Sequence, residues 1–300
     1  MKDVCILTEK RYLAPTKKNL YVKNILHEDG LVYDALNNVR LTCDRQAWDG
    51  RFDASKYRFL LFRTTWNYFD NLNLFKRFLN NSRIRPKLIN PYEQVVWNLD
   101  KKYLLYFKKQ GINIPDTTVV NHRQFKSLAS IFSLKGWKEV VIKPCVSAAS
   151  WNTYRIKISE ISKFEDLFYK LVNSQSMMVQ EFQNNIIKMG EVSVVMFGGK
   201  YSHAVIKSAK FGDFRVQDDF GGTYKKHLLS ENEISFCDKV MSACPFVPVY
   251  ARIDIIVDNK KKIALSELEI IEPELWLRMN QDSAKKFALA IKGYVVGCAP

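Results

Sequence analysis

The six cysteines of this 300-residue sequence form no CxxC pair, and there are only four histidines. Cysteines scattered in this way argue against a zinc site and against a framework of disulfides. Four separated histidines give no basis for a Ser-His-Asp triad, and we expect each of them to be structural. The run Gly198-Gly199-Lys200 lacks the upstream glycine and the following Ser or Thr of a P-loop. These absences exclude several common catalytic designs.

Long apolar runs are absent as well. No segment approaches the roughly 18 to 20 apolar residues that a membrane helix needs. The amino-terminal stretch MKDVCILTEKRY has neither the apolar core nor the small-residue cleavage site of a signal peptide. We therefore expect a soluble, cytoplasmic protein with no membrane partner. The hydrophobic content of 47% is enough for a large core divided among two or three subdomains.

The formal net charge of +15 favours phosphate-rich or acidic partners. The lysines are nevertheless spread over the whole chain, with no arginine-rich arm and no recognised nucleic-acid motif. We therefore do not expect nucleic acid as a partner.

The stretch from Tyr250 to Pro273, YARIDIIVDNKKKIALSELEIIEP, carries the most informative pattern. Two β-rich runs flank a polar, lysine-rich turn, which predicts a hairpin. A turn centred between Lys260 and Lys261 gives three cross-strand pairs: Asp258 with Ile263, Asp254 with Glu267, and Arg252 with Glu269. Because side chains alternate along a strand, the charged members of these pairs share one face.

Opposed carboxylates such as Asp254 and Glu267 repel each other on a sheet. A divalent cation reverses that repulsion, since Mg²⁺ prefers carboxylate oxygens together with substrate phosphates. The alternative is a solvated hairpin face with mixed charges, and spacing alone does not decide between the two. A slip of one residue in the turn would scatter the cluster.

Residues 1–93 alternate strand and helix signals. The nearly unbroken apolar run from Arg58 to Phe62 is typical of a buried parallel strand. Polar and aromatic residues follow it, at the end of the strand where ligands bind in open α/β sheets. We expect Arg63 either to bind a substrate carboxylate or to form a surface salt bridge. Trp66 and Tyr68 are further candidate substrate contacts.

Asp100 predicts a helix N-cap for KKYLLYFKKQ, with Gly111 as the matching stop. This places Lys101 in the first turn of a helix, with its ammonium free to reach a phosphate. Further along, Gly198-Gly199 predicts a hairpin between strands at 191–197 and 200–207. The glycine-punctuated segment GDFRVQDDFGG, residues 212–222, is typical of a loop over a site.

Eight segments, taken together and in order, resemble the ATP-grasp superfamily of carboxylate–amine ligases from about Arg63 to Ile291. The similarity is to the glutathione-synthetase-like branch that includes the cyclo-ligase of cycloserine biosynthesis. The segments are RTTWNYFDN, INPYEQVVWNLDKKYL, VIKPCVSAAS, MVQEF, GEVSVVMFGGKYSHAVIK, GDFRVQDDFGG, ARIDIIVD and ELEIIEP. The resemblance implies an N-terminal parallel α/β domain (1–93) followed by two α+β subdomains with antiparallel sheets (94–182 and 183–300), which clamp the nucleotide.

The resemblance also implies roles for individual residues. Lys101 and Lys143 would contact the nucleotide phosphates and the adenine edge, while Glu191 would hold the ribose hydroxyls. The adenine pocket would be lined, chiefly by backbone groups, by Gln180, Glu181 and Phe182. The Mg²⁺ ligands would be Asp254, Glu267 and Glu269, for two ions, with Mn²⁺ as an alternative metal. The catalytic residues would be Arg252, Arg215 and Lys207, the two arginines neutralising charge on the transferred phosphoryl group.

The implied reaction passes a phosphoryl group from ATP to a carboxylate, and an amine then attacks the acyl-phosphate to give an amide. Candidate loops for excluding water are 146–152 and 211–222. The substrate is a small molecule or peptide, such as a free amino acid, or one molecule closed on itself. The alternatives are a kinase that stops at phosphoryl transfer, or a non-catalytic protein that binds nucleotide or nucleic acid. The oligomeric state is open, and a dimer is compatible with the sequence.

Two departures from the family pattern bear on function. Ala148-Ala149-Ser150-Trp151 stands where relatives often carry glycines, so we expect a stiffer phosphate-covering loop. Asn67 stands where the branch usually has aspartate, which would alter the choice of substrate.

Overall fold

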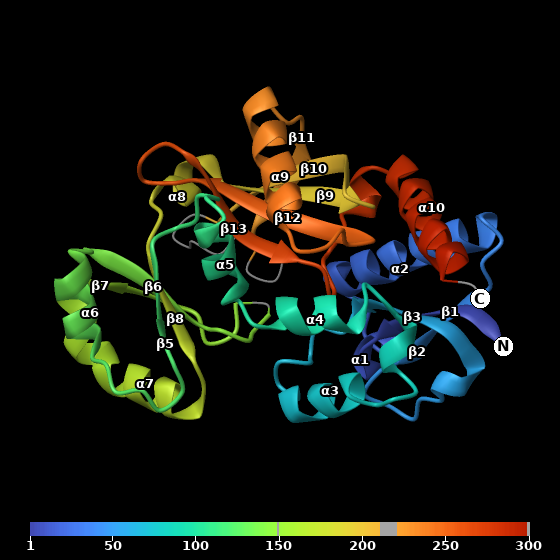
Figure 1. Ribbon diagram of the computed structural model, residues 1–300, viewed down its shortest axis with the longest axis horizontal. Helices are drawn as coiled ribbons and strands as arrows, with labels where there is room; N and C mark the ends of the chain where they lie inside the picture. Colours follow the sequence, from blue (N-terminus) through green and yellow to red (C-terminus); the bar gives the residue numbers. More distant parts are fainter. Residues whose placement is uncertain (149, 211–220, 299–300) are drawn as a thin grey trace.

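The computed structural model describes residues 1–148, 150–210 and 221–298, and it contains three sheets, each built from a different part of the chain (Figure 1). Most of the predicted loop 211–222, including Arg215, lies outside the described residues. Within the described residues, no helix is both long enough and apolar enough to span a bilayer.

The N-terminal sheet has the strand order β2-β1-β3-β4, and its strand pairs are parallel. Its middle strands, β1 (Lys2–Thr8) and β3 (Tyr57–Thr64), are buried along most of their length, as their apolar runs predict. The other elements of this part are α1 (Lys10–Leu13), α2 (Leu20–Asn38), β2 (Cys43–Ala47), α3 (Leu72–Leu79), β4 (Leu88–Ile89) and two 3₁₀ turns (Ala54–Lys56 and Arg85–Lys87).

The central sheet is antiparallel, with the order β5-β8-β6-β7, and forms a lobe at one side of the molecule (Figure 1). Helices α6 and α7 pack on this sheet through an apolar cluster that includes Phe132, Phe168 and Val179. Its elements are β5 (Thr117–Val120), α6 (Leu128–Lys135), β6 (Glu139–Pro144), β7 (Tyr154–Lys157), a 3₁₀ turn (Ile158–Glu160), α7 (Ile161–Ser174) and β8 (Met177–Glu181).

The C-terminal sheet is also antiparallel, with the order β11-β10-β9-β12-β13. Gly198 and Gly199 both have positive φ, as expected for the turn between β9 and β10. Its elements are α8 (Asn185–Met189), β9 (Glu191–Phe197), β10 (Lys200–Ser208), β11 (Thr223–His227), α9 (Glu231–Ala243), β12 (Tyr250–Val257), β13 (Ile263–Glu269), a 3₁₀ turn (Leu277–Met279) and α10 (Asp282–Gly297).

Two apolar cores join parts that are distant in the sequence. One contains Val32 of α2, Phe197 of β9 and Phe287 of α10, so the final helix fastens the C-terminal sheet to the N-terminal part. The other packs α5 (Tyr103–Lys109), which follows α4 (Tyr92–Leu99), against the C-terminal sheet, with Phe107 and Ile253 in the same cluster. The strands that carry the charged hairpin are therefore held from both sides.

The hairpin of β12 and β13 has the expected register at its base, with Arg252 opposite Glu269 and Asp254 opposite Glu267. The register then shifts by one residue, because Ser266 forms a β-bulge. Val257 therefore pairs with Ile263, and the expected pairing of Asp258 with Ile263 is wrong. Asp258 instead stabilises the turn, where its Oδ1 accepts the backbone N–H groups of residues 260 and 262.

Candidate active site

A cavity of about 300 Å³ brings together most of the residues singled out in the sequence. Those that line it are Trp66, Tyr68, Lys101, Lys143, Gln180, Glu181, Phe182, Glu191, Lys207, Arg252, Asp254, Glu267 and Glu269. They come from the N-terminal part, the central lobe and the C-terminal sheet, so the cavity depends on the assembly of all three.

Arg63 does not line this cavity. Strand β3 continues through Thr64, two residues beyond the apolar run, and Arg63 is therefore only 2% exposed. Its Nη1 donates to the carbonyl of Pro273 at 2.9 Å, and its guanidinium lies 5.8 Å from the centroid of the Phe287 ring. The expected surface salt bridge is wrong, and we do not retain Arg63 as a substrate contact.

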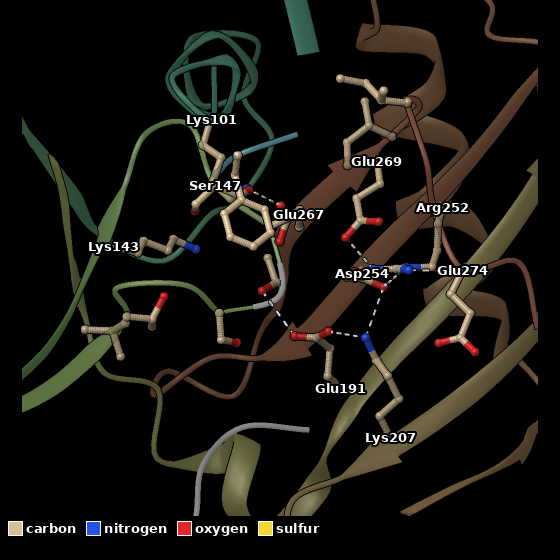
Figure 2. Close-up of a pocket in the computed structure, with 18 of the residues that line it drawn as sticks. Lys101, Lys143, Ser147, Glu191, Lys207, Arg252, Asp254, Glu267, Glu269 and Glu274 are labelled. Carbon is tan, nitrogen blue, oxygen red and sulfur yellow. Dashed lines mark hydrogen bonds and ion pairs between the residues drawn. The ribbon is translucent and has the colours of Figure 1, made fainter. Parts of the chain in front are cut away.

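A charged face of the C-terminal sheet forms the floor of the cavity. Alternation along β12 places Arg252 and Asp254 on this face, while Ile253 is fully buried on the other. Neighbouring strands contribute in register, because Ser193 of β9 pairs with Asp254. Figure 2 shows Arg252, Asp254, Lys207 and Glu191 converging from adjacent strands, with dashed lines marking the contacts between them.

Arg252 is the centre of this face. Its Nε lies 3.0 Å from Asp254 Oδ1, and its Nη2 donates to Asp254 Oδ2 at 2.8 Å and to Glu269 Oε1 at 2.5 Å. Burial alone would raise the pKa of Asp254, but Arg252 and Lys207 outweigh it and lower that pKa to about 2. Burial dominates at Glu269, where it raises the pKa to about 7 although Arg252 opposes it.

Lys207 of β10 is paired with Glu191 of β9, its neighbour in register. The ammonium lies 2.6 Å from Glu191 Oε1 and 3.6 Å from Asp254 Oδ1. Glu191 Oε2 accepts from the hydroxyl of Ser266, the bulge residue, at 3.3 Å. Both oxygens of Glu191 therefore have protein partners, and its predicted contact with ribose stays a prediction.

Lys101 reaches the cavity, but not from the first turn of a helix as expected. Asp100 ends α4, and its side chain accepts the N–H of Lys102, so that α5 begins only at Tyr103. The Lys101 ammonium lies 2.7 Å from Glu267 Oε1 and donates to the carbonyl of Ser147 at 2.6 Å. This second bond ties Lys101 to the loop that follows β6.

Lys143, from β6, is the second predicted phosphate ligand. Burial lowers the pKa of Lys143, and the charge of Lys101 lowers it further, while Glu267 opposes both. Its ammonium forms no hydrogen bond or ion pair with any residue that the structure describes. Lys143 is thus a partly buried cation that an incoming anion would stabilise.

The backbone N–H groups at the end of β8 already have hydrogen-bond partners within the protein. The N–H of Glu181 donates to Asp116 O and that of Phe182 to Glu139 O, both at 3.0 Å. Only carbonyl oxygens, which can accept a second hydrogen bond, are left for an adenine. Recognition of adenine by the backbone of these residues therefore stays a prediction, restricted to their carbonyls.

The loop after β6 carries left-handed residues that are not glycine. Ser150 has φ 54° and Asn152 has φ 50°. Asparagine tolerates this conformation better than most residues, whereas serine incurs a cost on the order of 1 kcal/mol. Ser147, Ala148 and Ser150 line the cavity, so the described part of this loop borders the site. The stiffer phosphate cover expected from its lack of glycine stays a prediction.

Several residues in or next to the cavity were missed by the sequence reasoning. Ser193 does not line the cavity, but its hydroxyl contacts Asp254 Oδ1; it could have been found, since Glu191 and Ser193 are the two polar residues, spaced by two, in the otherwise apolar strand EVSVVMF. Glu272 and Glu274 continue the acidic run of ELEIIEPE beyond β13. Glu274 pairs with Arg278 at 2.6 Å, whereas burial and the nearby Glu269 raise the pKa of Glu272 to about 8.

A family model described as the ATP-grasp domain of prokaryotic glutathione synthetase matches residues 101–275, more than half of the chain. The chain belongs to this ATP-grasp family. A second model, the N-terminal domain of D-cycloserine synthetase DcsG, matches residues 4–90 of the ATP-grasp chain. The family and the fold expected from the sequence are thereby confirmed, and the family is one of ATP-binding carboxylate–amine ligases.

Relatives of known structure match this ATP-grasp chain over nearly its whole length. The cycloserine biosynthesis protein DcsG of Streptomyces lavendulae is 26% identical over 274 residues, which are 86% of this chain and 90% of that protein. The crystal structure of D-cycloserine synthetase DcsG matches 97% of this chain and 99% of its own, with a TM-score of 0.84 and 24% identity. D-alanine–D-alanine ligase from Bacillus anthracis matches 99% and 98%, with a TM-score of 0.66 and 12% identity.

ATP-grasp enzymes use ATP with magnesium, and the related ligase PsnB has been solved with Mg and ADP. The carboxylate oxygens of this cavity are ligands of the kind that Mg²⁺ prefers, but only some of them are available to it. Glu267 and Glu269 each hold a cation through Oε1, and their side chains are 25% and 27% exposed, so each can turn a carboxylate oxygen toward a ligand. Both oxygens of Asp254 are already bonded to Arg252. Accordingly, no group of three His, Cys, Asp or Glu among the described residues is arranged to hold a metal.

Proposed function

We propose that this protein joins a carboxylate to an amine at the expense of ATP, through an acyl-phosphate. The observation that supports this most directly is the charged face of the C-terminal sheet that lines the cavity. Lys101, Lys207 and Arg252 all line it, and each of them pairs with a carboxylate of the protein. Such fixed cations stabilise the negative oxygens of phosphoryl transfer without reorganising during the reaction.

The bonding changes are the following. An oxygen of the substrate carboxylate attacks the γ-phosphorus, the bond from that phosphorus to the bridging oxygen breaks, and ADP leaves. The amine then attacks the carbonyl carbon of the acyl-phosphate, phosphate leaves, and the nitrogen loses a proton. Arg252 and Lys207 hold the charge that gathers during the first step, and the loop containing Ser147 and Ser150 excludes water from the acyl-phosphate.

Magnesium would be held by Glu267 and Glu269, with phosphate oxygens completing the coordination. When bound, it neutralises charge on the phosphate oxygens. Asp254 would serve as a third ligand only if its ion pair with Arg252 broke. This exchange would in turn free the guanidinium for the phosphoryl group.

The relatives suggest the substrate class. One is named for the ligation of D-alanine, an amino acid, and another for the biosynthesis of cycloserine, a compound related to amino acids. We therefore infer a small amino-acid-like substrate. The test measures release of ADP and phosphate with Mg²⁺ across a panel of D- and L-amino acids. A phosphorylated product that accumulates without any amine acceptor would identify a kinase instead.

Three variants sharpen this test. Asp254→Asn and Glu267→Gln should lower turnover at least tenfold, since each removes a charge from the cavity floor. Glu231→Gln, at the exposed start of α9, is the matched control and should turn over like the wild type. An active enzyme that loses nothing in the first two variants would show that the assignment of the charged face is wrong.

A further inference from the structure

Glu272 is a buried carboxyl group of the cavity to which the steps above give no role. It lines the cavity beyond the end of β13 and is 7% exposed. Its Oε2 is buried and has no hydrogen-bond partner among the described residues. A buried carboxylate oxygen without a partner is costly, and native proteins rarely leave one unless a ligand or water satisfies it.

Most other carboxylates of the same cavity are compensated; Glu181, which is less buried than Glu272, also has no ion pair within the described residues. Five of them each contact a lysine or an arginine: Glu191 with Lys207, Asp254 with Arg252, Glu267 with Lys101, Glu269 with Arg252, and Glu274 with Arg278. No ion pair joins Glu272 to any cation in the described part of the chain. The protein thus supplies a buried carboxyl group without a cation of its own, and a positive group bound beside it would favour its ionised form.

Aromatic side chains surround this position. Trp66 donates its indole N–H to the carbonyl of Glu272 at 3.0 Å, and the Tyr68 hydroxyl interacts with the Glu272 carboxyl group. Tyr21, which also lines the cavity, packs on Trp66 with ring centroids 6.2 Å apart. A carboxylate next to aromatic rings is an environment that favours a cation over a neutral or anionic group.

We propose that Glu272, with Trp66 and Tyr68, forms a subsite for the primary ammonium group of an amino-acid substrate. The proposal rests on the ligase function and specifies which substrates it accepts. The carbonyl of Glu274 accepts from Arg252 Nη1 at 3.4 Å, which holds the segment carrying Glu272 beside the phosphoryl-transfer residues. An α-ammonium bound at Glu272 therefore leaves the carboxylate one carbon away, on the side of Arg252.

The test compares pairs of ligands that differ only in this group. The protein is loaded with a non-hydrolysable ATP analogue and Mg²⁺, and binding of glycine, D- and L-alanine, and D- and L-serine is measured by calorimetry. The matched α-hydroxy acids are glycolate, D- and L-lactate, and D- and L-glycerate. The wild type should bind at least one amino acid roughly tenfold to a hundredfold more tightly than its hydroxy acid, as expected for a charged hydrogen bond.

Glu272→Gln should abolish this preference while the affinity for the ATP analogue is unchanged. Glu274→Gln is the matched control, because that carboxylate already has Arg278, and this variant should keep the preference. Equal binding of amino and hydroxy acids by the wild type would overturn the subsite, as would a preference that survives in Glu272→Gln. Since binding is measured without turnover, failure of ADP release would count against the ligase function and not against the subsite.

Discussion

Replacing Glu272 by glutamine should stabilise the ligand-free protein, and the gain should grow with pH. The pKa of Glu272 is raised from an ordinary 4.5 to about 8, first by burial and then by the charge of Glu269. The folded state therefore binds a proton more tightly than the unfolded chain does. Stability is lost as the pH rises from 4.5 to about 8, because folding must then either retain that proton or bury a charge.

The size of the effect follows from these two pKa values. The whole difference between the two pKa values corresponds to a loss of about 5 kcal/mol in the free energy of unfolding. About 4 kcal/mol of this loss develops between pH 5 and pH 8.5. Glutamine has nearly the same shape as glutamic acid and carries no titrating proton. The free energy of unfolding of Glu272→Gln should therefore exceed that of the wild type by little at pH 5 and by several kcal/mol at pH 8.5.

Urea unfolding at these two pH values, with EDTA and without nucleotide, measures the difference. Glu231→Gln is the control for replacing a glutamate that is exposed to solvent and lies outside the cavity. A Glu272→Gln variant that is no more stable than the wild type at pH 8.5 would refute the argument. It would mean that Glu272 is charged and compensated in the folded protein.

Two further predictions concern binding and backbone geometry. Lys101→Met should weaken ATP binding, measured by calorimetry, roughly tenfold to a hundredfold, whereas Lys102→Met should not, because that side chain is 37% exposed and pairs with a surface carboxylate. Gly190→Ala should cost about 2 kcal/mol or more in urea unfolding, since Gly190 has φ 76° and a Cβ there would collide with the carbonyl of Lys207. Gly30→Ala is its control: it lies within helix α2 with open space around it, and the change should stabilise the protein by roughly 0.5 to 1 kcal/mol.

The sequence was most informative about the base of the hairpin. Alternation within β12 and β13, with a turn centred between Lys260 and Lys261, predicts Asp254 opposite Glu267, and the structure confirms this pairing. The outer part of the hairpin lies one residue out of that register, and the bulge at Ser266 restores the predicted pairing at the base. The bulge at Ser266 could not be predicted from alternation, because the added residue leaves the spacing between Glu267 and Glu269 on the same strand unchanged. The error falls only on the outer part of the hairpin, where the assignment of Asp258 was wrong.

The predictions that were wrong rest on local sequence patterns that are compatible with two different structures. Asp100 precedes an amphipathic run and therefore has the sequence of a helix N-cap, but it ends α4 and caps a short turn instead. Arg63 follows an apolar run and could lie at its exposed end, yet β3 extends past it and tertiary contacts bury it. In both cases the deciding contacts come from residues distant in the sequence, such as the carbonyls of Cys145 and Pro273.

The repulsion between Asp254 and Glu267 first suggested a metal, and the structure gives it a different immediate explanation. Arg252 compensates Asp254 and Lys101 compensates Glu267, so each of the two opposed carboxylates has a positive partner within the protein. Among the described residues, this face holds no group of three side chains already arranged for a metal, and its role as a metal site stays a prediction. The face is a buried set of ion pairs in which each cation is a candidate phosphate ligand. A bound nucleotide would draw these cations to its own oxygens, and the carboxylates released by that exchange are the groups that magnesium requires. Metal and nucleotide should therefore bind to this face together, each completing the site for the other.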